Sequence, residues 1–178
     1  MIFVTVGTTY FDELIEAMDL LKGSGKIKDV VVAQIGSGRY IPHHLEYFRY
    51  APSLDEYYRE ADLVVTHAAA GTLFTLLSMK KKIVAVTNPR LKVLLKRDKI
   101  KVVTESRGLV EIKNRQEELP LKLEEMGYLV WCPDVKDLED AINRALQKEF
   151  REYVSPECFI RDEIEKRLGV RLREEIDQ

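Results

Sequence analysis

The chain opens on Ile2-Phe3-Val4-Thr5-Val6-Gly7-Thr8-Thr9, the stretch that indicates its fold most directly. Residues 2–6 are apolar or β-branched without alternation, which is typical of a strand buried on both faces of a parallel sheet. A Gly-Thr-Thr turn follows at once, and a helical pattern begins near Phe11. A strand, a glycine turn and a helix in this order predict the start of an α/β fold.

Strand-like and helix-like segments alternate along the rest of the chain. Continuous apolar runs predict central strands, and each helical pattern supplies one crossover connection. Strands are expected at 2–6, 30–33, 63–66, 83–87 and 129–131 with a weaker one at 47–50, and helices at 11–21, 54–60, 70–79, about 119–126 and 138–146. The pattern predicts an α/β, Rossmann-like parallel sheet with helices on both faces.

Two regions depart from this alternation. Residues 91–113 predict an inserted β-hairpin, with arms at 100–104 and 109–112 that flank Arg107-Gly108. The C-terminal stretch has apolar residues at every fourth position among many charges, which indicates an amphipathic helix; these residues are Ile160, Ile164, Leu168, Leu172 and Ile176. We expect a Rossmann-like sugar-nucleotide-binding domain over residues 1–150 and a C-terminal amphipathic helix or tail over 151–178.

The composition is that of a globular protein. The 178 residues are 46% apolar and 33% charged, which excludes collagen-like, low-complexity and largely disordered chains. The apolar runs are far shorter than the ~18 residues of a membrane-spanning helix, and the N-terminus lacks the charged region of a signal peptide, so a cytoplasmic location is expected. Cys132 and Cys158 are too isolated to predict a disulfide framework or a zinc site.

The net charge of −2 conceals a basic segment. Residues 80–113 hold eleven Lys or Arg against three acidic residues. Such a segment suits an anionic lipid surface or an acidic partner, so peripheral contact with a membrane is one interpretation. A solvated, lysine-rich surface of a heat-stable protein is the other.

Three loops that directly follow predicted strands are candidate ligand sites. Gly7-Thr8-Thr9 offers backbone N–H groups, two hydroxyls and the positive end of a helix dipole to an anion. It lacks the glycines of a dinucleotide fingerprint and the lysine of a P-loop, so neither NAD nor Mg-ATP is indicated. The alternative is an ordinary helix cap, with Thr8 or Thr9 as the N-cap.

The second loop runs from Thr66 to Thr72, and the third is Gln34-Ile35-Gly36-Ser37-Gly38. Ligands of open α/β sheets bind at the carboxyl edge where the strand order reverses, so His67 could meet a phosphate or a sugar oxygen there, or act as a structural hydrogen bonder. The glycines of the third loop permit positive φ, or mark an ordinary loop. No metal-ligand spacing or G-x-S-x-G elbow occurs, so we expect no metal and no cofactor.

Short motifs follow one another in a consistent order from residue 1 to about 148. They are residues 2–9 with Phe11-Asp12, Gln34-Ile35-Gly36 with Gly38, 61–68 with Gly71-Thr72, Asn88, Asn114 with Gln116, Glu118-Leu119 and Gly127-Tyr128. Together they resemble the C-terminal domain of family 28 glycosyltransferases, and within it the small cytosolic subunits of two-part UDP-GlcNAc transferases of dolichol-linked oligosaccharide synthesis.

The resemblance implies one half of a GT-B enzyme that binds a UDP-sugar donor and transfers N-acetylglucosamine or a related hexosamine to a lipid-linked acceptor. It also implies inverting, metal-independent transfer and a membrane-anchored Rossmann-type partner subunit that binds the acceptor. No nucleic-acid partner is expected.

The resemblance also implies the site residues. The diphosphate would lie over Gly7 to Thr9 and Gly71-Thr72, with His67 orienting it or the sugar, while the general base would come from the partner. The full substrate-binding set is Gly7, Thr8, Thr9, Gln34, Gly36, His67, Ala70, Gly71, Thr72, Thr75, Asn88, Arg115 and Gln116.

Several positions differ from the family pattern. The family has glycine at position 69, glutamate at 75 and histidine at 115, where this chain has Ala69, Thr75 and Arg115, and its Gly-Lys-Pro is replaced by Lys80-Lys81-Lys82. These differences favour an alternative, a non-catalytic scaffold or regulatory homologue with a degenerate nucleotide pocket. A stand-alone sugar-nucleotide enzyme such as an epimerase is a third hypothesis, although one Rossmann half lacks the second wall of the cleft. Pro120 predicts that its helix starts late or kinks.

Overall fold

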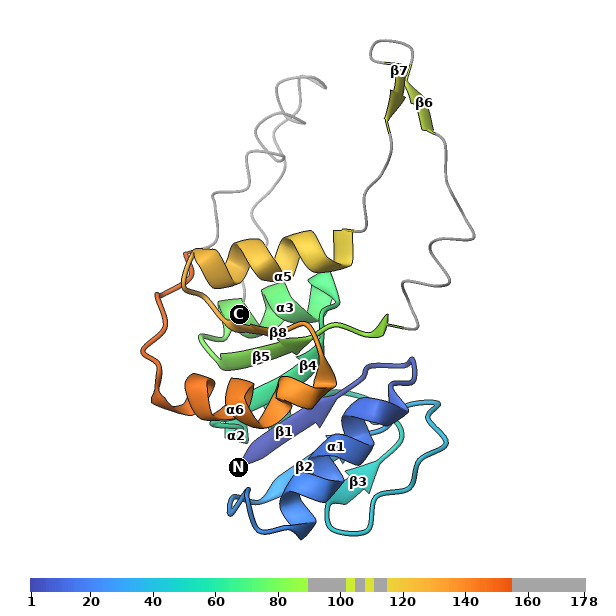
Figure 1. Ribbon diagram of the computed structural model, residues 1–178, viewed down its shortest axis with the longest axis vertical. Coiled ribbons are helices and arrows are strands. Elements are labelled where there is room, and N and C mark those ends of the chain that lie inside the picture. The colour runs from blue at the N-terminus through green and yellow to red at the C-terminus, as the bar shows by residue number, and fades with distance from the viewer. Residues whose placement is uncertain (90–101, 105–107, 111–114, 155–178) are drawn as a thin grey trace, which may run out of the picture.

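Six parallel strands form the central sheet of the computed structural model, which describes residues 1–89, 102–104, 108–110 and 115–154 (Figure 1). The strand order is β3-β2-β1-β4-β5-β8. The strands are β1 (Ile2–Thr5), β2 (Val31–Gln34), β3 (Glu46–Phe48), β4 (Leu63–His67), β5 (Lys82–Val86) and β8 (Val130–Cys132). The predicted parallel sheet is therefore confirmed, and the weak run at 47–50 corresponds to the edge strand β3.

The register of the central strands places three loops side by side. Thr5 at the end of β1 pairs with Gln34 on one side and Thr66 on the other, so β1, β2 and β4 end close to the same level. The chain runs outward from β1 through β2 to β3, and then through β4 and β5 to β8 in the opposite direction. The strand order therefore reverses between β1 and β4, where α/β sheets bind their ligands.

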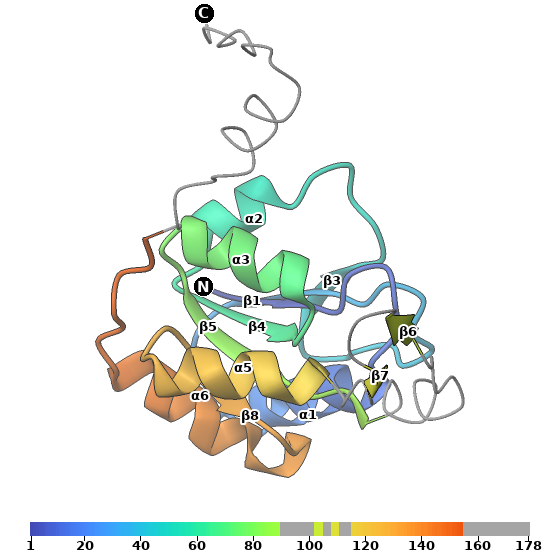
Figure 2. The same cartoon turned by 90° about the horizontal axis from the view of Figure 1, so that it is seen from above.

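Helices cover both faces of the sheet (Figure 2). They are α1 (Asp12–Gly23) and α6 (Leu138–Gln147) on one face, and α2 (Asp55–Glu60), α3 (Ala70–Ser78) and α5 (Arg115–Glu125) on the other, with a 3₁₀ turn η1 (Val135–Asp137) before α6. Successive side chains of a strand point to opposite faces. Val4 accordingly packs in one core with Leu14 of α1 and Ile142 of α6, whereas Phe3 packs in the other with Leu73 of α3.

The inserted hairpin is present between β5 and α5. Strands β6 (Val102–Thr104) and β7 (Gly108–Val110) pair antiparallel, with Val103 opposite Leu109. The predicted arms at 100–104 and 109–112 are thus confirmed as a pair of strands. Most of the basic segment 80–113 and most of the expected amphipathic helix or tail at 151–178 lie outside the described residues.

Pro120 predicted a late start or a kink for helix α5, and the late start is wrong. The helix begins at Arg115 and continues through Pro120 to Glu125. Pro120 is itself buried, and Leu119 and Leu123 pack against the core beneath α3. This burial offsets the backbone hydrogen bond that proline cannot donate. Within the described ranges, no helix is both long and apolar enough to cross a membrane.

Candidate functional site

The loops after β1, β2 and β4 meet at the carboxyl edge of the sheet. The backbone N–H of Ser37 donates to the carbonyl of Thr9 at 3.0 Å, which joins the loops after β1 and β2. A Cβ atom built on Gly7 would lie 3.2 Å from Cε1 of His67, so the loop after β1 also contacts the end of β4, where the loop from Thr66 to Thr72 begins. The structure therefore brings together the three candidate loops that the sequence indicated.

The loop after β1 is a tight turn and not a helix cap. The hydroxyl of Thr9 donates to the carbonyl of Val6 at 2.8 Å, and Gly7 has a φ of +64°, which favours glycine. The N-cap of α1 is Phe11, with no capping side chain. The alternative in which Thr8 or Thr9 caps α1 is therefore wrong, because the helix starts at Asp12, three residues beyond Thr9. The N–H of Gly7 donates to the hydroxyl of Thr5 at 3.1 Å and is already used within the chain.

His67 lies beneath Gly7 with a buried, unsatisfied nitrogen. The residue is 8% exposed, and its Nδ1 has no hydrogen-bond partner among the described residues. Burial lowers the pKa of His67 below the usual 6.5 and outweighs an opposing interaction with the Thr5 backbone. The imidazole is therefore neutral at pH 7. Buried polar atoms are nearly always paired, so this nitrogen indicates a missing partner such as a ligand or water.

The N-terminus of α3 is open to an anion. Its N-cap, Ala69, provides no capping side chain, and its first turn has no acidic residue, whereas α1, α2, α5 and α6 each have two there. Gly71 is exposed, lacks a positive φ, and a Cβ atom built on it would meet nothing within 4 Å. Neither packing nor backbone conformation within the described chain explains this glycine.

Other predicted site residues have structural partners. Gln34 is 4% exposed, and its Oε1 accepts a hydrogen bond from the Thr5 hydroxyl at 2.6 Å. Asn88 is 3% exposed, and its Nδ2 donates to the carbonyl of Tyr10 at 3.1 Å. Both side chains form hydrogen bonds with residues next to the loop after β1, so they position the site.

The remaining predicted residues lie around α3 and α5. Ala70 and Thr72 form the first turn of α3, and Thr75 is exposed one turn further on, with its hydroxyl donating to the Gly71 carbonyl at 3.0 Å. Arg115 and Gln116 begin α5, but their side chains lie outside the described part of the structure.

The sequence reasoning missed a cavity between the loops after β1 and β2. It has a volume of about 350 Å³ and is lined by Tyr10, Asp12, Ser37 and Arg39. Asp12 Oδ1 accepts hydrogen bonds from the backbone N–H groups of Arg39 at 2.9 Å and Tyr40 at 3.3 Å. A Cβ atom on Gly38 would lie 2.5 Å from this oxygen, which explains the glycine there. The signal in the sequence was Asp12 in a helix first turn together with Gly38 in the facing loop.

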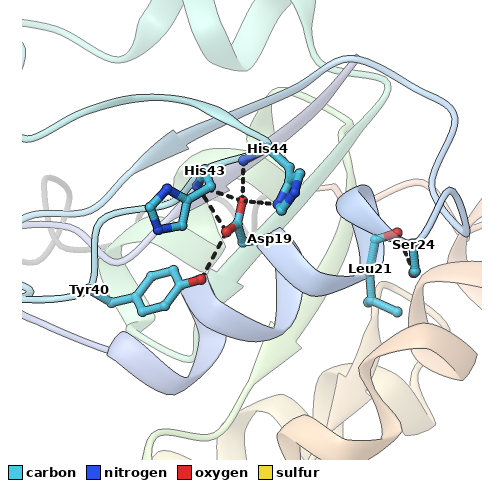
Figure 3. A network of polar contacts seen from close by, with 6 residues as sticks. All are labelled: Asp19, Leu21, Ser24, Tyr40, His43 and His44. Carbon is cyan, nitrogen blue, oxygen red and sulfur yellow. Dashed lines mark hydrogen bonds and ion pairs between the residues drawn. The ribbon is translucent and has the colours of Figure 1, made fainter.

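Asp19, two turns further along α1, holds the same loop at its far end (Figure 3). Its carboxylate is 2% exposed and accepts hydrogen bonds from the Tyr40 hydroxyl at 2.8 Å and from the N–H groups of His43 and His44 at 2.9 and 2.6 Å. Burial raises the pKa of Asp19, but these hydrogen bonds and the nearby His44 outweigh it and hold the pKa below its usual 3.8. Burial and the bond to Asp19 raise the pKa of Tyr40 to about 12.

Solved glycosyltransferases share this fold. The glycosyltransferase SnogD from Streptomyces nogalater matches with a TM-score of 0.52 at 17% identity, over 82% of this chain and 34% of that one. Spinosyn forosaminyltransferase SpnP matches with a TM-score of 0.52 at 13% identity, over the same shares of the two chains. The sheet and its helices are those of one Rossmann-like half of a GT-B glycosyltransferase.

Sequence comparison gives the family. A model of the glycosyltransferase family 28 C-terminal domain matches residues 1–168, and the chain belongs to this family. UDP-N-acetylglucosamine transferase subunit ALG13 of Homo sapiens is 32% identical over 142 residues, which are 74% of this chain and 11% of that protein. The Mus musculus protein of the same name is 32% identical over 143 residues, 73% of this chain and 10% of that protein. The chain thus spans about a tenth of the length of these curated relatives.

Proposed function

We propose that this chain is the donor-binding subunit of a hexosyltransferase. It would transfer N-acetylglucosamine or a related hexosamine from a UDP-sugar to a lipid-linked acceptor, together with a separate membrane-associated subunit that binds the acceptor. Membership of family 28 and the similarity to the mammalian UDP-N-acetylglucosamine transferase subunits support this proposal. The observation that carries it is the combination of the open N-terminus of α3 and the unsatisfied Nδ1 of His67 at the end of the preceding strand β4, next to the point where the strand order reverses.

The proposed chemistry is electrostatic. The bond from the sugar to the diphosphate breaks as the acceptor hydroxyl attacks, and negative charge develops on the leaving UDP. The N–H groups at Gly71 and Thr72 and the positive end of the α3 dipole would stabilise that charge without reorganising. Neutral His67 would form a hydrogen bond with a phosphate or sugar oxygen. The base that removes the proton of the acceptor hydroxyl would come from the partner subunit.

Gly71→Ala should separate ligand binding from stability. A methyl group at position 71 meets no atom of the described chain, and alanine favours helix, so we expect the free energy of unfolding to stay level or rise by up to about 1 kcal/mol. The same methyl group would occupy space that the diphosphate needs, so UDP should bind about tenfold more weakly, a difference of about 1.4 kcal/mol. Calorimetric titration with UDP and urea unfolding of the same protein measure the two effects.

Ser78→Ala is the matched control on the same helix. Ser78 is exposed near the other end of α3, and its hydroxyl donates to the Phe74 carbonyl at 2.9 Å. It should leave UDP binding unchanged. Equal UDP affinity of the wild-type and Gly71→Ala proteins would contradict the proposed diphosphate position.

Thr75→Glu tests whether the nucleotide ribose lies against α3. Thr75 is exposed one helical turn beyond Gly71, where the family resemblance implies a carboxylate. A charge-assisted hydrogen bond contributes about 1.5–3 kcal/mol, so a glutamate that accepts from the ribose hydroxyls should tighten uridine nucleotide binding about tenfold. A 2′,3′-dideoxy analogue, which has no diol, should show no gain. Tighter binding of both nucleotides, or of neither, would show that the ribose does not lie against α3.

A non-catalytic scaffold is the second candidate function. The presence of Ala69 and Thr75 at positions where the family has glycine and glutamate favours it, since a threonine that already bonds Gly71 cannot make a bidentate contact with a ribose. A scaffold would give no uridine-dependent signal in the titration with UDP.

We also propose that the basic segment 80–113 contacts an anionic membrane.

A further inference from the structure

We infer that the cavity lined by Tyr10, Asp12, Ser37 and Arg39 is a second ligand site, which binds a sugar phosphate. The juxtaposition that points to it is Arg39, exposed on a loop anchored at several points, together with Asp12 of α1 in the lining of one cavity of about 350 Å³.

The cavity and the proposed donor position lie on opposite sides of β1. Ser37 and Arg39 follow β2, whereas His67 and Gly71 follow β4, and these two strands flank β1. Tyr10 and Asp12 follow β1 itself. A donor diphosphate over the β1 and β4 loops would therefore leave the β1–β2 cavity free for another molecule.

The loop that forms one wall is held rigidly although it lacks regular secondary structure. Asp12 binds its N–H groups at Arg39 and Tyr40. The guanidinium of Arg49 donates to the carbonyls of Gly36 and Gly38 at 3.1 and 2.8 Å, and Asp19 holds the end of the loop (Figure 3). Such preorganisation reduces the entropy lost when a ligand binds.

The lining groups match a sugar phosphate. The guanidinium of Arg39 makes no hydrogen bond or ion pair with the residues that the structure describes, and its planar fork suits a phosphate. Asp12 uses Oδ1 for the loop, which leaves Oδ2 to accept from a sugar hydroxyl. The Ser37 hydroxyl and the Tyr10 ring supply a polar and a partly apolar wall.

Size and charge favour a sugar phosphate over a bare anion. The volume is near the lower end of small-molecule sites, roughly 300–1,000 Å³, so it suits one sugar with its phosphate. Asp12 repels a bare anion and offsets the attraction of Arg39, because both residues line the same cavity. A molecule that places a hydroxyl on Asp12 and a phosphate on Arg39 satisfies both groups, and inorganic phosphate does not.

The experiment is a titration of the full chain with N-acetylglucosamine 1-phosphate in the presence of saturating UDP. Ligand-observed NMR measures the binding. We expect binding at a site that UDP and UDP-GlcNAc leave open. Arg39→Ala should weaken this binding by about tenfold or more and leave UDP binding unchanged, since a hydrogen bond to a charged group is lost. The variant keeps the backbone N–H that bonds Asp12, and Arg39→Lys should retain part of the affinity. Arg59→Ala is the matched control, because this exposed arginine lies on α2, where its Nε donates to the Asp55 carbonyl.

Each outcome decides the inference. Displacement of the sugar phosphate by UDP would assign the cavity to the donor nucleotide, and displacement by UDP-GlcNAc alone would assign it to the donor sugar; either result overturns a second ligand site. Equal competition by inorganic phosphate would reduce it to an anion site. Loss of sugar-phosphate binding in Arg39→Ala with no UDP binding in any variant would overturn the proposed function and support the cavity as a sugar-phosphate site. Absence of sugar-phosphate binding in the wild-type chain overturns the inference whether or not UDP binds.

Discussion

Gly36→Ala should destabilise the chain by about 3–5 kcal/mol, a large part of the total stability of a typical domain. Gly36 is buried with a φ of +52°, a conformation that costs an alanine roughly 1–2 kcal/mol. A Cβ atom there would lie 2.2 Å from the carbonyl oxygen of Thr9 and 2.7 Å from that of Gly7. Both contacts are with backbone, so no side-chain rotation can relieve them. The loops after β1 and β2 must therefore separate, and the hydrogen bond from Ser37 to Thr9 is lost.

Gly25→Ala isolates the backbone contribution to this effect. Gly25 has a φ of +76°, but a Cβ atom built on it would meet nothing within 4 Å. It should lose only the roughly 1–2 kcal/mol of the left-handed conformation. Urea unfolding of both variants measures the difference. The geometry indicates that the close packing of the two loops contributes to stability. This would be contradicted if Gly36→Ala lowers the free energy of unfolding no more than Gly25→Ala does.

The sheet was predictable because its strands are buried on both faces. Such strands are continuous apolar runs, and the runs at 2–6, 63–66 and 83–87 contain the strands β1, β4 and β5 or overlap them closely. The edge strand β3 gave a weaker signal, since Glu46 and Tyr47 are exposed and edge strands need less apolar surface. The antiparallel pairing of Val103 with Leu109 followed from the two β-branched runs around a glycine.

The side-chain roles at the site were less predictable. Motifs place a residue near a ligand, but they do not tell whether its side chain faces the ligand or the loop beneath it. Gln34 accepts from Thr5 and Asn88 donates to Tyr10, so both support the turn that the motif describes. The same limit applied to Asp12, which was noted only as part of a motif, and to Asp19, which no motif marked. Their partners are backbone N–H groups, which every residue except proline carries and which no sequence pattern reveals.

Asp19→Ala should destabilise the chain by about 2–4 kcal/mol at neutral pH, because buried donors lose a charged acceptor. The carboxylate is 2% exposed and binds the N–H groups of His43 and His44 and the hydroxyl of Tyr40. Without it the loop between β2 and β3 loses its anchor on α1. Tyr40→Phe is the matched control, since it removes one of these donors and keeps the carboxylate; a loss of about 1 kcal/mol is expected.

The pH dependence gives a second test of Asp19. Its pKa is lower in the folded chain than the usual 3.8, so near that pH the unfolded state binds more protons than the folded state. The carboxylate therefore contributes its full stabilisation above about pH 4, and this contribution is lost as the pH falls through the folded pKa. Urea unfolding at neutral pH and at about pH 3 should show the wild-type protein losing stability relative to Asp19→Ala, so that the gap between them narrows. Tyr40→Phe keeps the carboxylate and its backbone partners, and should lose stability in acid in parallel with the wild type. A gap between wild type and Asp19→Ala that stays constant across this range would show that the folded chain does not favour the ionised carboxylate, and the loop would then be held by packing alone.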